Sequence, residues 1–220
     1  AGYGLHTMGD IAMASLRSED WLDKMVGIDA ELLIDHAWGY ETCRMSDIKN
    51  YHSEEHSLSN GQVLMRNYSF DEALVIVREM TDNLVLDLFE KGLVTSSLTL
   101  WIAYDHRYEH EASKGTVKLE RESNSSKKII DAVEDLYLRI ADRYTGIRRI
   151  EVCANRVAPE SYVQYSLFDD PKQTDKERHL QEAVLNVKQR YGKNAIMRGS
   201  NLLECSTYRE RNEQIGGHRA

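Results

Sequence analysis

Across residues 57–155 the hydrophobic pattern switches repeatedly between the period of a strand and the period of a helix. Two long segments repeat apolar residues at helical spacing, and four shorter ones alternate apolar and polar residues as half-buried strands do. The order is βαββαβ. Each helix must bury its apolar stripe against a sheet, so this order predicts an α+β domain with four strands and both helices on one sheet face.

The element limits follow from local signals. Strands are expected at residues 57–64, 93–104 and 116–121 and again after Gly146, with Asn60-Gly61 as a kink or bulge in the first. A charged loop is expected at 105–114. The first helix, residues 70–90, carries the stripe Phe70, Ala73, Leu74, Val77, Met80, Leu84 and Leu88. The second is expected from Ser126 to about residue 144, with Ser125 or Ser126 as its cap.

The sheet face opposite the helices is then open. The strand phases place on it Ser97, Thr99, Trp101, Thr116, Lys118 and Arg149. Hydroxyl and cationic side chains suit phosphate contacts, which favours a nucleic-acid surface. Glu120 and Glu151 share the face, so an ordinary solvent-exposed surface is the alternative, and Trp101 is more typical of packing than of base stacking.

The net charge of −8 argues against a nucleic-acid partner, but its distribution matters more than its sum. Acidic residues concentrate in the two predicted helices, whereas the strand-like segments carry Lys118, Arg121, Arg148, Arg149 and Arg156. A domain with an acidic back and a basic sheet face fits this pattern. The three cysteines are widely spaced and form no metal-binding or disulfide pattern, so a reducing cytoplasm is the simplest setting.

The segments on either side read differently. Residues 1–40 are expected to form short helices, and 41–56 a polar connector. Residues 175–191 predict a polar amphipathic helix whose narrow stripe is Leu180, Ala183, Val184, Val187 and Tyr191. The charged, glycine-containing residues 209–220 are expected to be mobile.

A compact peptide motif lies in the polar segment between Pro159 and Pro171. It consists of Gln164, Tyr165, Ser166, Leu167 and Phe168. The Leu and Phe can fill an apolar pocket on a partner while the Gln amide hydrogen-bonds at its edge, and bacterial sliding clamps capture client proteins with short peptides of this pattern. The alternative is a strand end or a disordered segment that happens to carry two hydrophobic residues.

These features together resemble the C-terminal half of Y-family DNA polymerases, the UmuC- and DinB-type enzymes that copy damaged templates. The likeness rests on residues 57–64 (SLSNGQVL), the helix from Asp71, the βαββαβ order and the motif at 164–168. The tail, at 185–194 and 213–218, is similar to the Gram-positive UmuC-like or UvrX-like branch. Residues 4–12 and 37–40 resemble the end of the family's thumb domain.

The resemblance implies a division of the chain. Its parts are the end of the thumb at 1–40, a linker at 41–56, the little finger domain at 57–158, a clamp-binding linker at 159–174, and a C-terminal helix and tail at 175–220. It further implies that the catalytic carboxylates and their Mg²⁺ belong to a palm domain of the full-length parent. No catalytic residue, metal or cofactor is therefore expected in this part.

The resemblance also implies two partners, a primer–template DNA duplex and the bacterial sliding clamp (its β subunit). The residues expected to contact DNA are Ser57, Ser59, Asn60, Ser97, Thr99, Lys118, Arg121, Arg148, Arg149 and Arg156. Those expected to contact the clamp are Gln164, Tyr165, Ser166, Leu167 and Phe168. A ferredoxin-like protein-interaction or regulatory module without DNA binding, and an RNA-binding α+β domain, are the other hypotheses.

Two patterns mimic metal sites. Residues 68–73 (YSFDEA) are similar to a palm motif of the family, yet here Asp71 and Glu72 open an amphipathic helix that Ser69 can cap, so we interpret them as a helix start. The pairs His52/His56 and His106/His110 have the spacing of helical metal ligands but lie in polar loops beside acids, which favours solvated side chains.

Overall fold

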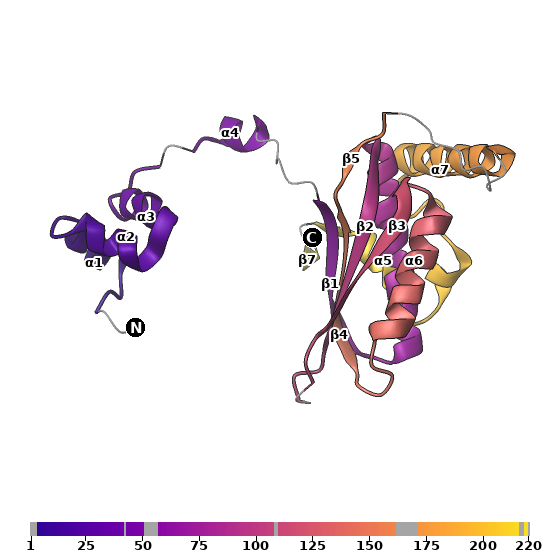
Figure 1. The fold of residues 1–220 in the computed structure, drawn as a ribbon, viewed down its shortest axis with the longest axis horizontal. Coiled ribbons are helices and arrows are strands. Elements are labelled where there is room, and N and C mark those ends of the chain that lie inside the picture. The colour runs from indigo at the N-terminus through magenta and orange to yellow at the C-terminus, as the bar shows by residue number, and fades with distance from the viewer. Residues whose placement is uncertain are drawn as a thin grey trace. The chain divides into compact units, whose positions relative to one another are not determined.

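The computed structural model describes residues 4–41, 43–50, 57–107, 110–161, 171–215 and 218–219. The chain divides into two compact units, Ala1–Glu54 and Glu55–Ala220, and each is described by itself (Figure 1). None of the helices in the described ranges combines the length and the apolar character that a membrane crossing requires.

The first unit is helical over residues 4–40, as the sequence predicts, and a further helix, at residues 45–50, lies within the predicted connector. Its elements are α1 (Met8–Ser15), α2 (Glu19–Val26), the 3-10 turn η1 (Gly27–Asp29), α3 (Ala30–Ala37) and α4 (Met45–Asn50). Thr7 and Asp10 form a reciprocal capping box at the start of α1. Leu22 and Ala30 are buried between the helices, and the Trp38 indole donates to Ser15 Oγ at 3.1 Å.

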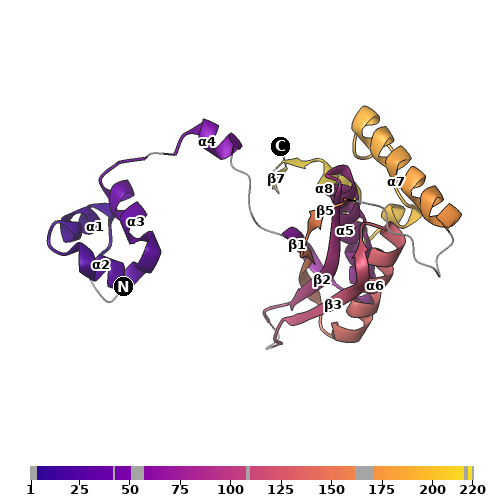
Figure 2. The same cartoon turned by 45° about the horizontal axis from the view of Figure 1, so that its top comes forward.

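The second unit is an antiparallel sheet with two helices on one face, which confirms the predicted α+β fold (Figures 1 and 2). Its elements are β1 (Ser57–Tyr68), α5 (Phe70–Glu90), β2 (Leu93–Tyr104), β3 (Ser113–Ser123), α6 (Ser126–Ile140), β4 (Ile147–Asn155) and β5 (Ala158–Pro159). The long strands run β1-β4-β2-β3 across the sheet, so β4 and β2 are central. The short β5 pairs with the start of β2 and makes a fifth strand that the sequence does not predict.

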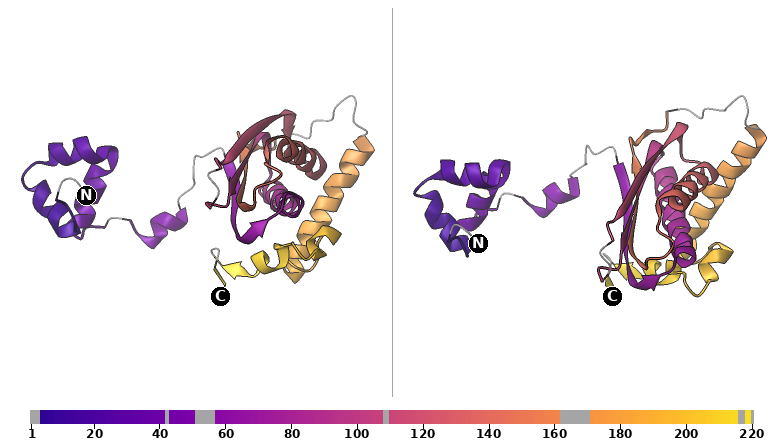
Figure 3. Two further views of the ribbon diagram at one scale, coloured as in Figure 1. Left: turned by 90° about the horizontal axis from the view of Figure 1, so that it is seen from below. Right: turned by 60° about the horizontal axis from the view of Figure 1, so that its bottom comes forward.

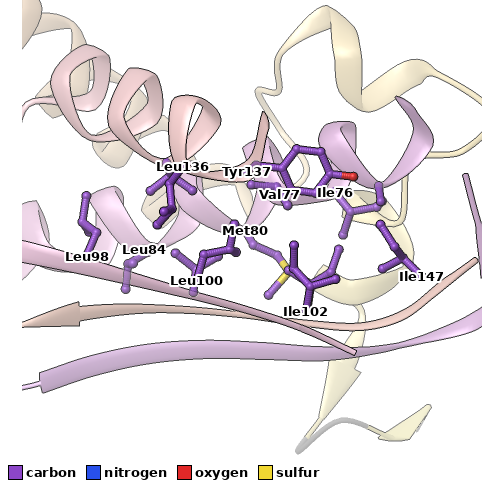
Figure 4. Packing of buried hydrophobic residues seen from close by; sticks show 14 of the residues in the cluster. Ile76, Val77, Met80, Leu84, Leu98, Leu100, Ile102, Leu136, Tyr137 and Ile147 are labelled. Carbon is purple, nitrogen blue, oxygen red and sulfur yellow. The ribbon is translucent and has the colours of Figure 1, made fainter. Parts of the chain in front are cut away.

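The core lies between the sheet and the two helices. Leu98, Leu100 and Ile102 of β2 are fully buried on the helical side, as strand alternation requires (Figure 4). Tyr137 of α6 is also fully buried, and its hydroxyl donates to the backbone oxygen of Phe70 at 2.7 Å. That hydrogen bond satisfies the polar atom of the largest core side chain and ties α6 to the start of α5.

The start of α5 is a helix cap, as interpreted from the sequence. Glu72 N donates to Ser69 Oγ, Ser69 N donates to Glu72 Oε2 at 2.9 Å, and the Arg66 guanidinium donates to both Glu72 oxygens. These contacts, with the Arg66 bond as the largest cause, lower the pKa of Glu72 to about 2. The carboxylate therefore holds β1, the turn and the helix together.

Several strand and helix limits differ from those predicted. β1 continues to Tyr68, and its register irregularity lies between Val63 and Tyr68 rather than at Asn60-Gly61. α6 ends at Ile140, short of residue 144. β3 begins at Ser113, which pairs with Ile102, and Gly115 within it lets α6 approach closely, since a Cβ there would lie 2.8 Å from Leu136 Cδ1. Thus Lys114 belongs to a strand instead of the predicted loop.

The helix after the peptide motif is α7 (Pro171–Tyr191), which begins four residues before the predicted limit of 175. It lies on the helical side of the sheet (Figure 3). Only part of its predicted apolar stripe packs on the domain: Val184 and Val187 are half-buried, whereas Leu180 and Tyr191 are 63% and 66% exposed. Polar side chains dock beside it: the buried Gln181 side chain donates to Asn124 O at 3.0 Å, and Arg178 pairs with Glu160 at 2.7 Å.

Residues 192–213, called the C-terminal strap from here on, cross the helical layer. They include η2 (Gly199–Leu202) and α8 (Tyr208–Asn212), and a two-stranded ribbon of β6 (Gln214–Ile215) and β7 (His218–Arg219) follows. Arg198 pairs with Asp82 of α5 at 2.6 Å. Tyr208 is 1% exposed, and Thr207 N donates to the buried Glu79 carboxylate at 3.3 Å.

The strap also contacts the edge strand β1. Gln62 donates to Thr207 Oγ1 at 2.9 Å, and Arg211 donates to Gln62 Oε1 at 3.1 Å and to Asn60 Oδ1. Burial raises the pKa of Glu79 and lowers that of Arg211. The helix α5 therefore packs against the sheet on one side and against the strap on another.

We expect Tyr208→Ala to lower the free energy of unfolding by about 3 kcal/mol, since it removes a large side chain from a closed site. Urea unfolding measures this. Leu202→Ala is the matched control in the same strap, and because Leu202 is 69% exposed it should change stability by less than about 0.5 kcal/mol. Equal stabilities of wild type and Tyr208→Ala would show that the strap is not anchored.

Glu72→Gln should cost about 1 kcal/mol at pH 7, because the carboxylate caps α5 and binds Arg66. The folded pKa of Glu72, about 2, lies below its ordinary value of 4.5, so the ionised form is favoured by folding. Its contribution is complete above pH 4.5 and is lost as the pH falls toward 2.

The stability difference between wild type and Glu72→Gln should therefore shrink as urea titrations are repeated from pH 7 down to pH 3. Asp71→Asn is the control, because it removes a charge from the same helical turn and leaves the cap in place. A difference that stays constant over this range would contradict the assigned role of the Glu72 carboxylate.

Candidate nucleic-acid interface

The sheet face opposite α5 and α6 is open and polar, and its residues stand in cross-strand rows set by the register. One row joins Ser57, Asn155, Ser97 and Lys118; the next joins Ser59, Cys153, Thr99 and Thr116; a third joins Gly61, Glu151, Trp101 and Lys114. Arg149 follows, between Val63 and Ala103. All four long strands therefore contribute polar side chains to one surface.

A shallow hollow of about 630 Å³ lies on this face. Its lining residues come from β2, β3 and β4 and are Ser97, Thr99, Trp101, Lys114, Thr116, Arg149, Glu151, Cys153 and Asn155. The hollow follows from the twist of the sheet and from the small side chains along its centre. Such a concave, polar surface suits an extended partner more than a small apolar ligand.

A hydrogen-bonded ladder fixes the hydroxyls at one end of the hollow. The Asn155 amide donates to Thr99 Oγ1 at 2.8 Å, and Thr99 Oγ1 lies 2.9 Å from Thr116 Oγ1 on the neighbouring strand. Cys153 lies beside them, and burial raises the pKa of its thiol, so this side chain is neutral at pH 7. The ladder holds three side chains in fixed rotamers and leaves oxygen and amide groups facing solvent.

The cationic end of the hollow is built around Arg149. Its guanidinium lies 5.0 Å from the centre of the Trp101 ring, and its Nη2 lies 3.5 Å from Glu151 Oε2. A cation over an indole face is favourable and restricts the arginine rotamer. The sequence context of Trp101 favours a packing role. In the structure its ring also positions the Arg149 guanidinium.

The structure brings six of the predicted DNA contacts together. Ser57, Ser59, Ser97, Thr99, Lys118 and Arg149 occupy the cross-strand rows of the open face, although Ser97 is only 6% exposed. Sequence reasoning missed Lys114, because Gly115 obscured the start of β3. The register places it opposite Trp101.

The other predicted contacts do not share these rows. Asn60 points to the helical side, where the strap's Arg211 binds it, so we drop it from the proposed surface. Arg148 falls at the register irregularity between Ile147 and Arg149. Arg121 lies at the register irregularity of β3, between Lys118, which pairs with Ser97, and Ser123, which pairs with Thr95. Arg156 is an exposed residue with a φ of 50° just after β4.

The predicted clamp contacts, Gln164, Tyr165, Ser166, Leu167 and Phe168, lie outside the described residues, as do His52 and His56. His106 is exposed in the turn after β2, and His110 packs against the Tyr104 ring at 4.3 Å. Within the described ranges, His, Cys, Asp and Glu side chains form no group of three or more that could hold a metal ion.

Comparison with known proteins gives one family. The model of the impB/mucB/samB family C-terminal domain matches residues 55–167. A protein named DNA polymerase IV 2 from Bacillus subtilis (strain 168) is 26% identical over 219 residues, which are 98% of this chain and 50% of the relative. Its namesake from Halalkalibacterium halodurans is 21% identical, covering 98% of this chain and 51% of the relative. The chain thus spans about half the length of these curated relatives.

Two solved structures are also similar. One is a chimera of the Y-family DNA polymerases Dbh and Dpo4, at 17% identity and a TM-score of 0.42 over 71% of this chain and 42% of the other. The second is a post-insertion binary complex of Dbh DNA polymerase, at 15% identity and a TM-score of 0.35 with the same coverage.

Proposed function

The chain belongs to the impB/mucB/samB family of Y-family DNA polymerases, and from this premise we propose that it is the DNA-binding and clamp-tethering part of an error-prone translesion polymerase. Residues 57–158 would be the little finger domain, and residues 1–40 the end of the thumb. The parent would act in DNA repair and the SOS response, in the bacterial cytoplasm and at the nucleoid when engaged.

One observation carries the DNA-binding proposal: the open sheet face is a hollow lined by hydroxyls, amides and cations from neighbouring strands. Backbone phosphates accept hydrogen bonds from such groups, and cations that bind phosphates release condensed counterions. In this arrangement Lys114, Lys118 and Arg149 supply salt-dependent affinity. The Thr99–Thr116–Asn155 ladder supplies position without reading base sequence.

The acidic net charge does not oppose this arrangement, because the two faces of the domain differ. Acidic residues of the two helices lie away from the open face, and several are neutralised locally: Asp82 by Arg198 and Glu134 by Arg78. The open face carries its cations on β3 and β4. Glu120 and Glu151 share this face with Lys114, Lys118 and Arg149, so a duplex would meet a small excess of positive charge on an acidic domain.

The second part of the proposal concerns Gln164–Phe168. The sequence motif supports docking on the sliding clamp, with Leu167 and Phe168 in an apolar pocket and the Gln164 amide at its rim. Burial of each apolar side chain would contribute roughly 1.5–3 kcal/mol before ordering costs. Tethering raises the local concentration of the polymerase at the primer terminus, which compensates for weak DNA affinity.

Catalysis itself we assign to a palm domain of the full-length parent. There, carboxylates would hold the two Mg²⁺ ions that activate the primer 3′-hydroxyl and stabilise the leaving pyrophosphate. On this account the present chain is inactive alone. It contributes grip on the duplex and attachment to the clamp.

A second candidate function is a protein-interaction or regulatory module that does not bind DNA. The net charge of −8 favours it, since acidic proteins are repelled by the DNA backbone at long range. The two candidates differ in one measurable property, the dependence of DNA binding on salt.

The first prediction is that the chain binds a primed duplex. The logarithm of the association constant should fall linearly with the logarithm of the salt concentration, with a slope set by the number of phosphates contacted. Fluorescence anisotropy between about 50 and 200 mM salt measures this. Lys118→Glu with Arg149→Glu should abolish binding. Arg139→Glu, the same kind of charge reversal on exposed α6, should cost far less. Absence of binding by wild type at low salt would leave the interaction-module alternative.

The second prediction concerns the clamp. Leu167→Ala with Phe168→Ala should abolish capture of the chain by immobilised sliding clamp, because both apolar anchors are lost. Leu202→Ala with Leu203→Ala removes two exposed leucines of the strap, outside the motif, and should retain most of the capture. Undiminished binding by the Leu167/Phe168 double variant would remove the clamp assignment.

A further inference from the structure

An acidic residue occupies the middle of the open face. Glu151 lies on the central strand β4, in register with Gly61 on one side and Trp101 on the other. Its side chain stretches across the glycine, since a Cβ on Gly61 would lie 3.7 Å from Glu151 Cγ. The side chain is 38% exposed, so its carboxylate is accessible to whatever enters the hollow.

The same carboxylate pairs with Arg149, one of the two cations that line the hollow. Glu151 Oε2 lies 3.5 Å from Arg149 Nη2, while the Trp101 ring holds the guanidinium at 5.0 Å. The Arg149 side chain is 50% exposed, which leaves it reachable from solvent. Arg149 is therefore restrained between an aromatic ring and a counter-ion before any nucleic acid arrives.

We propose that Glu151 is a built-in brake on DNA affinity, a role that rests on the proposed DNA-binding function of this face. A phosphate that binds Arg149 competes with the carboxylate for the guanidinium, so the gain from one ion pair is offset by the weakening of another. The carboxylate stays in the hollow beside the phosphate and repels it. The face thus binds DNA more weakly than its cations alone would allow.

A brake of this kind has a functional consequence. Affinity differences at an interface are expressed mostly in the dissociation rate, so Glu151 shortens the time that the face stays on the duplex. Residence at the primer terminus then depends on the tether to a second site more than on the sheet. Glu151 would thus favour DNA that the chain reaches while tethered at that second site over DNA that it meets free in solution.

The test is Glu151→Gln, which keeps the size of the side chain and removes its charge. We expect duplex binding about two- to fivefold tighter at low salt, because an exposed charge contact is worth up to about 1 kcal/mol. Freeing Arg149 for a phosphate should also steepen the logarithmic salt dependence by about one phosphate contact. Anisotropy titrations on the whole 220-residue chain at four or more salt concentrations give both quantities.

Two controls separate position from net charge. Glu120→Gln removes the same charge from exposed β3, outside the hollow, and should change affinity by less than about twofold. In an Arg149→Gln background, Glu151→Gln should lose most of its effect on the salt slope, because the cation paired with Glu151 is gone. This double-mutant cycle isolates the Arg149–Glu151 coupling.

The outcomes divide cleanly. Wild type that binds DNA, with Glu151→Gln unchanged in affinity and slope, overturns the brake and leaves the DNA-binding proposal intact. An equal gain from Glu120→Gln overturns it also, in favour of a general charge effect. If neither wild type nor Glu151→Gln binds at low salt, both proposals fail; binding that appears only in Glu151→Gln supports the brake in its strongest form.

Discussion

The fold depends on one constraint: a strand has two faces, and α5 and α6 bury only one of them. Leu100 and Ile102 of β2 and Ile150 and Val152 of β4 are fully buried beneath the helices. Their neighbours in sequence must then point the other way, where neither α5 nor α6 covers them. The polar hollow is thus a direct consequence of core packing, and a register shift of one residue would place its cations in the core.

The C-terminal strap makes the two sides of the domain unequal. It contacts α5 through Thr207, buries Tyr208 and binds β1 through Arg211. The helix α5 therefore has the sheet on one side and the strap on another. The buried Glu79 carboxylate accepts from Thr207 N, while its Oε1 has no hydrogen-bond partner among the described residues. A polar, partly unsatisfied contact of this kind costs stability. The contact between Thr207 and Glu79 therefore indicates that the strap binds at one defined position, and not through non-specific burial of apolar side chains.

The sequence predicts what local signals determine. The limits of α5 and β2 match because Ser69 with Glu72 starts the helix and Gly92, at a φ of 62°, ends it. It misses what long-range contacts decide. Arg211 meets Asn60 across 151 positions, and no periodicity in residues 209–220 signals that contact. Likewise α7 docks through the polar residues Gln181 and Arg178, which an apolar stripe does not predict. Gly115 reads as a loop residue in the sequence, and only its contact with Leu136 in the structure explains a glycine within β3.

The central claim is that the open face, and not the helical layer, meets the DNA. Site-directed photocrosslinking to a primed duplex tests it most directly. In a background with Cys43, Cys153 and Cys205 replaced by Ser, the same crosslinker is attached at Thr116→Cys in the hollow or at Asp131→Cys, an exposed position on α6. The account predicts crosslinking from residue 116 that is lost at high salt, and little from residue 131. Equal crosslinking from both positions, or a stronger signal from residue 131, would contradict it.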